Sequence, residues 1–369
     1  MIPLKKIKVL HIIPTFKTGG AERLLLDIMK GIDINKFEPS VLIFKEKGEL
    51  YEDLKKLPIS VFFVIKKFKF DIKNIWKMFQ IIKNEQPDII HTHLGGDIYG
   101  RLIAHWLGIP VVSTEHNINK DEGRLTTFAK SLTARYAVRI IAVSNAVKND
   151  ILSRYRISAS KIQVVYNGID LNTFHKEKLV DATGRKRKNN ETFHIGAVGR
   201  LVEQKGFVYL IEAIKIVKEQ FPYVVCEIAG DGTLRNSLKK IINENNLEKN
   251  IFLPGINSDI LSFYSSLDLF VMPSLWEGLG IAVLEAAALE IPVIASSVDG
   301  LNEIIENNID GILVAPGNSG ELADRIIESI THYEDSQKRA QLLSEKIRSR
   351  FSISDMVKQY ETVYENIIS

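Results

Sequence analysis

The sequence predicts an α/β protein with two doubly wound domains, each built on a parallel sheet. Short β-branched apolar runs alternate with amphipathic stretches almost throughout, which is typical of parallel sheets covered by helices on both faces. A polar, basic segment interrupts this alternation once, near the middle of the chain. A chain of 369 residues is also long for a single core, which favours two domains.

The first half opens with the predicted strand IKVLHIIP, which a Gly-Gly turn connects to the helical pattern AERLLLDIMKGI. Further strands are predicted in this half at PSVLIF, ISVFFVI, PDIIHTH, PVVSTEH, RIIAVS and IQVVYN. Residues 1–171 are therefore assigned to an N-terminal domain. Residues 172–192 are polar and basic and are predicted to be the interdomain linker, with a long surface loop as the alternative.

The alternation resumes in residues 193–351, which we assign to a C-terminal domain. Its predicted strands are FHIGAVGRL, VVCEIAG, IFLPG, LDLFVMPS, IPVIASS and GILVAPG. The last stretch, 352–369, is helical and has no following strand to support, so we expect it to pack back onto the N-terminal domain. Two such domains joined by one linker are expected to face each other across a ligand-binding cleft.

Composition narrows the class of protein. With 45% hydrophobic and 25% charged residues the chain is globular, and Cys226 as the only cysteine excludes an intrachain disulfide. The apolar start is short and interrupted by Lys8 and His11, so a buried strand is favoured over a signal peptide. No apolar run reaches 18 residues, so no membrane span is expected.

Charge is distributed unevenly along the chain. Residues 1–180 carry 29 Lys and Arg against 18 Asp and Glu, whereas the remainder carries 19 against 27. A basic half favours a phosphorylated ligand, an anionic membrane surface or nucleic acid as partner. The RKRK run within 172–192 is interpreted as a solvated charge run, and no nucleic-acid partner is expected.

Two glycine and cation motifs are candidates for binding phosphate. Gly19 and Gly20 follow a strand and open a helix, where free backbone N–H groups and the helix dipole favour an anion; a tight turn without a ligand is the alternative. Arg200 and Lys205 follow the first strand of the second domain and suit a diphosphate, with ordinary surface cations as the alternative. Neither G-x-G-x-x-G nor G-x-x-x-x-G-K-[ST] occurs, which disfavours dinucleotide and P-loop sites.

Three histidines lie at the ends of neighbouring predicted strands. His91 and His93 end one strand, and His116 ends the next. A zinc site is disfavoured because no H-E-x-x-H motif accompanies them. His116 is the better candidate, since a neutral imidazole can bond a substrate hydroxyl; a hydrogen-bonded histidine without a ligand is the alternative.

Two glutamates with seven residues between them follow the strand LDLFVMPS. Glu277 precedes a helix expected to begin near Ile281, so capping that helix is an alternative to ligand binding. The intervening turn offers the backbone N–H groups of Gly278, Leu279 and Gly280. Glu285 is flanked by apolar residues, and a buried charge without a partner is costly, so it should have a hydrogen-bonding partner or ligand.

Taken in order, these stretches resemble the retaining GT-B glycosyltransferases, specifically glycosyltransferase family 4. The matching motifs are GGAE, HTH, TEHN, VSNAVK, VVYNGID, GRLVEQKG, IAGDGTLR, PSLWEGLGIAVLEAAALEIPVIAS and GILVAPGN. The block with two glutamates after a strand ending in Pro-Ser is specific to the family. One departure is DGLNE at residues 299–303, where the family often has Gly-Gly-x-x-Glu, and this loop is not assigned to the site.

The resemblance implies transfer of a sugar from a nucleotide-sugar donor to a glycan or lipid-linked acceptor, in cell-surface polysaccharide or glycolipid synthesis. It implies that Arg200 and Lys205 neutralise the donor diphosphate and that Gly20 closes over it. Glu277 would hold sugar hydroxyls, Glu285 the ribose and His116 a sugar hydroxyl near the reacting carbon. No metal and no cofactor are implied, and the anomeric configuration is retained without a protein nucleophile. An epimerase or hydrolase of nucleotide sugars on the same plan is the alternative.

The acceptor side is less defined by the sequence. The stretch Val64–Phe79 mixes lysines with aromatic and aliphatic residues, a composition that suits an anionic lipid surface, with a solvent-exposed amphipathic helix as the alternative. We therefore expect a cytoplasmic protein, with peripheral attachment at the inner face of the membrane as a hypothesis.

Overall fold

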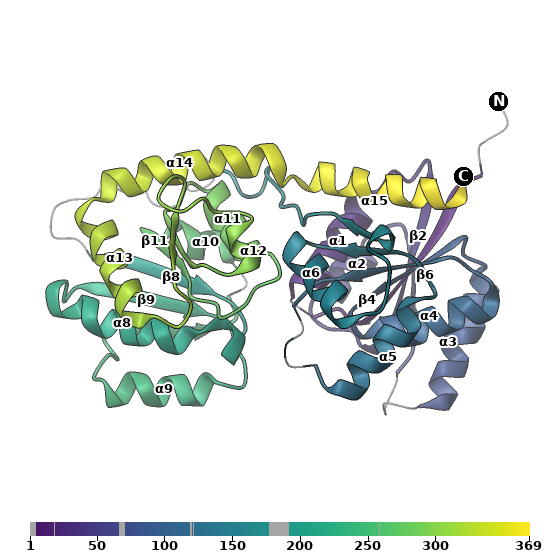
Figure 1. The fold of residues 1–369 in the computed structure, drawn as a ribbon, viewed down its shortest axis with the longest axis horizontal. Helices are drawn as coiled ribbons and strands as arrows, with labels where there is room; N and C mark the ends of the chain where they lie inside the picture. The colour runs from purple at the N-terminus through teal and green to yellow at the C-terminus, as the bar shows by residue number, and fades with distance from the viewer. Residues whose placement is uncertain are drawn as a thin grey trace. The chain divides into compact units, whose positions relative to one another are not determined.

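The computed structural model describes residues 5–17, 19–65, 71–118, 120, 122–176, 192–257 and 259–369. The chain forms two compact units: unit 1 is Met1–Gly168 together with Ile353–Ser369, and unit 2 is Ile169–Ser352. Each unit is a parallel sheet flanked by helices (Figure 1), which confirms the predicted fold class of two doubly wound α/β domains.

Unit 1 contains a parallel sheet with the strand order β3-β2-β1-β4-β5-β6-β7. The strands are β1 (Ile7–Thr15), β2 (Phe37–Glu46), β3 (Ser60–Phe63), β4 (Ile89–His93), β5 (Val111–Glu115), β6 (Ala137–Ala142) and β7 (Ile162–Val164). The helices are α1 (Gly20–Gly31), α2 (Tyr51–Lys55), α3 (Ile72–Glu85), α4 (Asp97–Leu107), α5 (Arg124–Ala134), α6 (Asn145–Arg154) and α15 (Ile353–Ile368). The strand order reverses between β1 and β4, the kind of point at which open α/β sheets bind ligands.

Unit 2 contains a parallel sheet with the strand order β10-β9-β8-β11-β12-β13. The strands are β8 (Phe193–Val198), β9 (Val224–Ala229), β10 (Ile251–Gly255), β11 (Leu269–Met272), β12 (Val293–Ser296) and β13 (Ile312–Val314). The helices are α8 (Phe207–Gln220), α9 (Arg235–Glu244), α10 (Ile260–Ser265), α11 (Ile281–Ala288), α12 (Asp299–Asn302), α13 (Ser319–Thr331) and α14 (Tyr333–Arg350). Here the order reverses between β8 and β11. Every strand predicted from the sequence is present in the two sheets.

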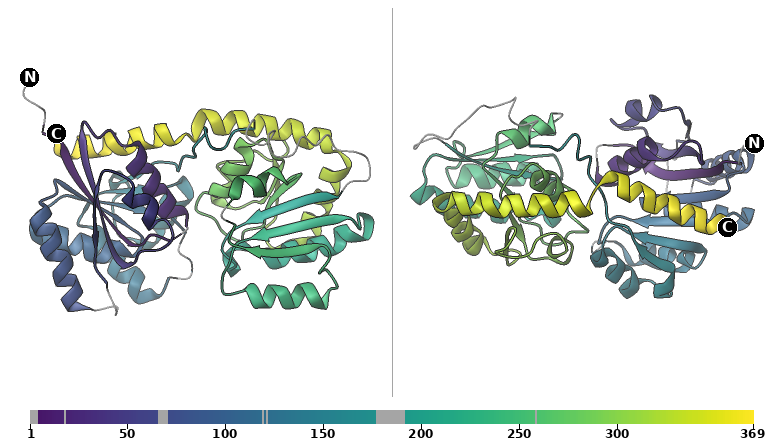
Figure 2. Two further views of the ribbon diagram at one scale, coloured as in Figure 1. Left: turned by 180° about the vertical axis from the view of Figure 1, so that it is seen from behind. Right: turned by 90° about the horizontal axis from the view of Figure 1, so that it is seen from above.

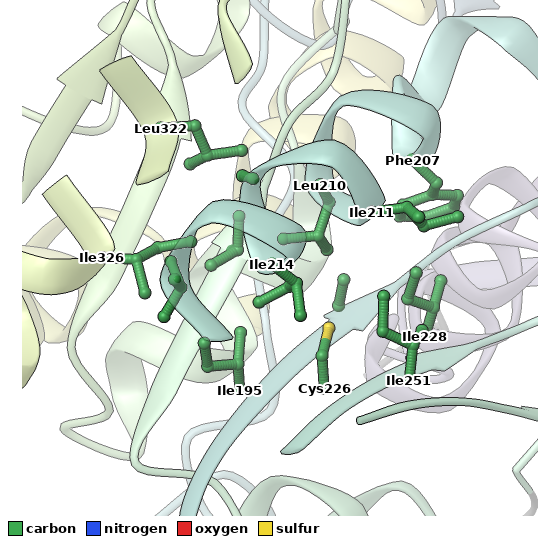
Figure 3. Close-up of a cluster of buried hydrophobic side chains, with 14 of the residues drawn as sticks. Ile195, Phe207, Leu210, Ile211, Ile214, Cys226, Ile228, Ile251, Leu322 and Ile326 are labelled. Atoms are coloured by element: carbon green, nitrogen blue, oxygen red, sulfur yellow. The ribbon is translucent and has the colours of Figure 1, made fainter. Parts of the chain in front are cut away.

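Helix α8 illustrates how the sequence pattern fixes helix and sheet together. Its buried apolar residues recur at helical spacing, namely Phe207, Leu210, Ile211, Ala213, Ile214 and Val217. In Figure 3 this apolar face lies against Ile195 of β8 and Cys226 of β9. Burial raises the pKa of the Cys226 thiol, so this side chain packs as a small apolar residue.

Helix α15 belongs to the core of unit 1 although it follows all of unit 2 in the chain. Its buried residues share one face and are Met356, Val357, Tyr360, Val363 and Tyr364. This face packs on α1, and Figure 2 shows α15 in yellow running along unit 1. Two polar contacts fix it further: the Tyr364 hydroxyl lies 2.6 Å from Nδ1 of His91, and Glu361 accepts the backbone N–H of Asp33 at 2.7 Å.

Some predictions fall on parts of the chain that the structure does not describe. Most of the predicted linker, residues 177–191, and residues 66–70 of the lysine-rich stretch lie outside the described residues. The predicted boundaries of the linker therefore stay predictions. Within the described residues, no helix is both long and apolar enough to cross a membrane.

Removing the Tyr364 hydroxyl tests how much α15 contributes to unit 1. In Tyr364→Phe the buried Nδ1 of His91 loses its partner, so we expect the free energy of unfolding to fall by about 1–3 kcal/mol. Urea denaturation measures the loss. Tyr360→Phe is the matched control, because its hydroxyl lies 3.5 Å from Oγ1 of Thr114, and it should cost less. Equal losses from both variants would contradict the assigned hydrogen bond.

Candidate functional site

The two strands at which the order of unit 2 reverses carry the residues of the candidate site. Lys205 ends a short 3-10 helix after β8, and Glu277 lies in the turn after β11. The Lys205 Nζ donates to Oε2 of Glu277 at 2.7 Å, and the Ser274 hydroxyl donates to the same oxygen at 3.2 Å. The Glu277 side chain is almost fully buried, so the cation and the hydroxyl compensate the desolvation of its carboxylate.

Backbone contacts hold the loops after β8 and β11 together. The backbone N–H of Leu275 donates to the carbonyl of Gln204 at 2.8 Å, and the Gln204 side chain donates to the carbonyl of Trp276 at 3.0 Å. Gly206 has φ of +62°, and a Cβ there would lie 2.1 Å from the carbonyl oxygen of Pro273. Only glycine fits this approach, so the position of Lys205 over the end of β11 depends on it.

Helix α11 begins at Ile281, as the sequence predicts. Its N-cap is Gly280, with a φ of +93° and without a side-chain cap hydrogen bond. The Glu277 carboxylate is bonded to Lys205 and Ser274, so helix capping is not its observed role. The residues of the turn before the helix are buried, namely Gly278, Leu279 and Gly280. The N-terminal end of α11 carries a partial positive charge, which favours an anion.

Glu285 has the hydrogen-bonding partner that its apolar surroundings predict. The hydroxyl of Tyr264, a buried residue of α10, donates to Oε2 of Glu285 at 2.8 Å. Glu285 itself is half-buried and lies within α11. Arg200 lies two residues after the end of β8 and is exposed. Asp231 accepts the N–H of Gly232 at 2.8 Å, within its own turn.

Unit 1 holds the other predicted site residues at the edge where its strand order reverses. Gly19 is the N-cap of α1, which begins at Gly20. The first turn of α1 contains Glu22, whose Oε1 accepts from the Thr15 hydroxyl at 2.8 Å. His116 directly follows β5. These residues therefore lie at the carboxyl ends of β1 and β5, two strands separated by β4.

Four histidines of unit 1 form a buried cluster. His93 Nδ1 lies 3.2 Å from His116 Nε2, and His93 Nε2 lies 3.1 Å from His11 Nδ1. His91 Nδ1 contacts Tyr364, and its Nε2 lies 2.7 Å from Oγ1 of Thr114. His11, His91 and His93 are also the residues that could hold a metal, with one nitrogen each within 4.8 Å of the others. A metal there would have to replace some of these hydrogen bonds.

A buried ionic network lies next to His116 in the chain. Arg101 is fully buried, donates from Nε to Ser113 Oγ at 2.8 Å, and has Nη2 3.6 Å from Glu115 Oε1. Lys130 Nζ lies 3.8 Å from the other carboxylate oxygen of Glu115. Burial raises the pKa of Asp97, beside Arg101, to about 6. The network fixes the end of β5, and with it the backbone from which His116 projects.

Several residues of these clusters were not identified from the sequence. They are His11, Gln204, Tyr264, Ser274 and Gly300. A Cβ on Gly300 would lie 2.4 Å from the carbonyl oxygen of Glu277, so this glycine allows α12 to approach the turn. The strand-ending Pro-Ser pair was a usable signal for Ser274. No local pattern marks His11, because its partner His93 is 82 positions away.

Two family models match the chain in succession. Residues 18–173 match the model described as Glycosyltransferase Family 4, and residues 182–349 match the model described as Glycosyl transferases group 1. Gly19 and Gly20 fall in the first match, and all the predicted site residues of unit 2 fall in the second.

Relatives and solved structures agree with these models. An Escherichia coli protein named UDP-Gal:alpha-D-GlcNAc-diphosphoundecaprenol alpha-1,3-galactosyltransferase is 31% identical, over 98% of each chain. The structure of a glycosyltransferase from Rickettsia africae is 26% identical, covers 99% of this chain and 100% of its own, and has a TM-score of 0.83. HepE from Anabaena, solved with UDP and glucose, is 24% identical with a TM-score of 0.86 and covers 97% of this chain and 99% of its own; this likeness is one of fold.

The buried histidines should make the stability of unit 1 depend on pH. Burial lowers the pKa of His11 to about 3 and that of His116 to about 4, from 6.5. Below pH 6.5 the unfolded chain binds protons that the folded chain does not, so the free energy of unfolding falls as the pH falls toward 4. Each such histidine contributes a slope of up to about 1.4 kcal/mol per pH unit.

Urea denaturation between pH 7 and pH 5 measures this slope. His11→Phe removes one of the groups and should give a shallower slope than the unaltered chain. An identical slope in the two proteins would show that His11 is not buried in its neutral form.

Proposed function

Because this chain belongs to glycosyltransferase family 4, we propose that it is a retaining enzyme that transfers a sugar from a uridine diphosphate sugar to a lipid-linked glycan. The E. coli relative supports this choice, since its name specifies UDP-Gal and a diphosphoundecaprenol-linked sugar. The observation that carries the proposal is the Lys205–Glu277 pair at the β8/β11 reversal of unit 2. Such a product belongs to the synthesis of cell-surface polysaccharide or glycolipid. The epimerase or hydrolase alternative has no support among these relatives.

The proposed donor roles follow from the chemistry of the residues. Lys205 and the exposed Arg200 neutralise the diphosphate, and the N–H groups of Gly278, Leu279 and Gly280 before α11 add partial positive charge. Glu277 accepts hydrogen bonds from sugar hydroxyls, and its ion pair with Lys205 couples the sugar end of the ligand to the phosphate end.

The remaining roles concern the ribose and the sugar. Glu285 accepts from the ribose hydroxyls, while Tyr264 holds one of its oxygens in place. Gly19 and Gly20 contribute the N-terminal end of α1 to phosphate binding, and His116 bonds a hydroxyl of the donor sugar.

The proposed mechanism relies on electrostatics at the leaving group. As the glycosidic bond breaks, negative charge develops on the departing diphosphate, and preorganised cations and N–H groups stabilise that charge in the transition state. The acceptor oxygen attacks the anomeric carbon on the face that the diphosphate leaves, and a leaving phosphate oxygen helps to take its proton, so neither a protein nucleophile nor a protein base is used. We propose that the two cations take the place of a divalent metal ion.

Transfer assays test this assignment through two variants. Lys205→Ala and Glu277→Ala should each lower the rate more than about tenfold, because oriented electrostatic groups of this kind contribute ~2.7–4 kcal/mol to the transition state. The assay measures UDP release from a UDP-sugar with and without a lipid-linked acceptor, and excess chelator should leave the rate unchanged. Release that does not depend on acceptor would favour the hydrolase alternative.

The exposed Lys240–Glu244 pair on α9 provides the matched control. Its two side chains are also an ion pair in unit 2, at 3.6 Å, but they are highly exposed. Lys240→Ala should therefore keep the normal rate. If Lys205→Ala behaves like Lys240→Ala, the proposed site is wrong.

We further propose that unit 1 attaches peripherally to an anionic membrane on the cytoplasmic side. Helix α3 exposes 79% of Ile72 and 58% of Trp76, with lysines at positions 73 and 77. Helix α5 exposes Leu125 and Phe128, and α4 contacts both helices (Figure 1). Exposed apolar side chains beside lysines suit the interface of an anionic bilayer.

Vesicle co-sedimentation tests this attachment. The protein should bind vesicles with anionic lipid more than neutral ones, and Trp76→Ser should weaken binding because its indole then no longer enters the interface. Tyr223→Ser is the control, since Tyr223 is an exposed aromatic residue of unit 2, with 76% of its surface accessible. Binding that ignores anionic lipid would rule out the proposed attachment.

A further inference from the structure

Three imidazoles of unit 1 form a continuous row from the middle of β1 to the end of β5, which we call the histidine row. Nδ1 of His11 lies 3.1 Å from Nε2 of His93, and Nδ1 of His93 lies 3.2 Å from Nε2 of His116. The outer nitrogens, Nε2 of His11 and Nδ1 of His116, have no hydrogen-bond partner among the described residues. The row therefore has two inner hydrogen bonds, and the outer nitrogen at each end has no hydrogen-bond partner among the described residues.

Each imidazole of the row is uncharged at neutral pH. All three side chains are more than nine-tenths buried, and burial lowers the pKa of His93 well below its ordinary value, as it does for His11 and His116. A neutral imidazole carries one N–H and one lone pair. Two facing nitrogens form a hydrogen bond only if one of them holds the proton. The three tautomers are therefore linked: every proton points toward His116, or every proton points toward His11.

The burial of the two ends decides between these arrangements. Both outer nitrogens are buried, but His11 is 0% exposed as a residue, whereas His116 is 8% exposed and therefore lies nearer the surface. A buried N–H without an acceptor is costly, and it is least costly at the end nearer the surface, where a small movement lets water or a ligand reach it. The outer N–H therefore belongs on Nδ1 of His116. In this arrangement His11 donates to His93, and His93 donates to His116.

The contacts of His91 favour this row over a metal site. Its Nδ1 lies 2.6 Å from the Tyr364 hydroxyl and its Nε2 lies 2.7 Å from Oγ1 of Thr114. Both nitrogens of His93 are occupied within the row. A metal ligated by His11, His91 and His93 would have to break a bond at His91 and another at His93.

We propose that His11 and His93 are positioning residues that fix the tautomer of His116, so that its Nδ1–H donates a hydrogen bond to a hydroxyl oxygen of the donor sugar. This inference rests on the proposed function, which places a sugar hydroxyl against His116. A fixed N–H donor rejects a sugar that lacks an oxygen at that position, because the donor is then left unpaired. The histidine row thus contributes to the choice of sugar.

Nitrogen-15 NMR of the full-length protein without substrate tests the tautomer directly. In the unaltered chain His116 should be protonated on Nδ1. His93→Asn retains an amide near the place of Nδ1 and should preserve that tautomer. His93→Phe retains a ring but cannot donate, so the proton of His116 should shift toward Nε2. His11→Phe, which leaves His93 in place, is a second variant if His93→Phe does not fold; it should weaken the same preference.

Three results would overturn the proposal. One is a proton on Nε2 of His116 in the unaltered chain. Another is a tautomer that neither Phe variant changes. The third is stoichiometric zinc in the purified protein that His91→Ala releases, since the histidines would then be ligands.

Kinetics then test whether the row acts through His116. With a UDP-sugar donor, His93→Phe should lower kcat/KM roughly two- to tenfold, as expected for one lost hydrogen bond. His93→Asn should stay close to normal. The double variant His93→Phe/His116→Phe should be no slower than His116→Phe alone, because His93 is proposed to act only through His116. Additive losses would mean that His93 acts independently, which contradicts the proposal.

The NMR and kinetic experiments together separate this inference from the proposed function. If the NMR result is as expected but His116→Phe transfers sugar at the normal rate, the row exists and the proposed role of His116 is wrong. If His116→Phe is slow but the tautomer of His116 is the same in the unaltered chain and in His93→Phe, the positioning role is wrong and the proposed function stands.

Discussion

Parallel strand pairing with a reversal of strand order is the constraint on which both groups of site residues depend. The connections that leave β8 and β11 run in opposite directions along the sheet, so the carboxyl ends of these two strands stay open to ligand. Lys205 and Glu277 follow these strands, and residues 72 positions apart in the chain consequently form an ion pair. In unit 1 the same reversal between β1 and β4 brings His11 beside His93.

Burial of polar groups determines how these open ends are shaped. Desolvating a charge is unfavourable unless a partner compensates it, and the chain supplies one in each case: Lys205 for Glu277, Tyr264 for Glu285, and Arg101 for Glu115. Each partner comes from a different element, so each pair ties two elements together. The orientation of the site is thus a consequence of meeting the hydrogen-bonding needs of buried side chains.

Much of the fold and part of the site were predictable from local patterns. Apolar runs predicted every strand, since a strand buried on both faces has to be apolar along its length. The apolar surroundings of Glu285 predicted that it needs a partner, but not that Tyr264 is that partner. The sequence left open a helix-capping role for Glu277, whereas in the structure its carboxylate accepts hydrogen bonds from Lys205 and Ser274. His11 was visible only as a polar residue that interrupts an apolar strand, and nothing near it in the sequence indicated that His93 is its partner.

The sequence by itself determined the α/β class, the strands, the start of α11 and the residue types that can meet a nucleotide sugar, because these depend on periodicity and on motifs within a few residues. The tertiary structure alone decided which side chains face each other: the Lys205–Glu277 pair, the order of imidazoles in the histidine row, and the docking of Tyr364 on His91. These contacts join residues 23 to 273 positions apart. Sheet register and helix packing set such distances, and no local pattern encodes them.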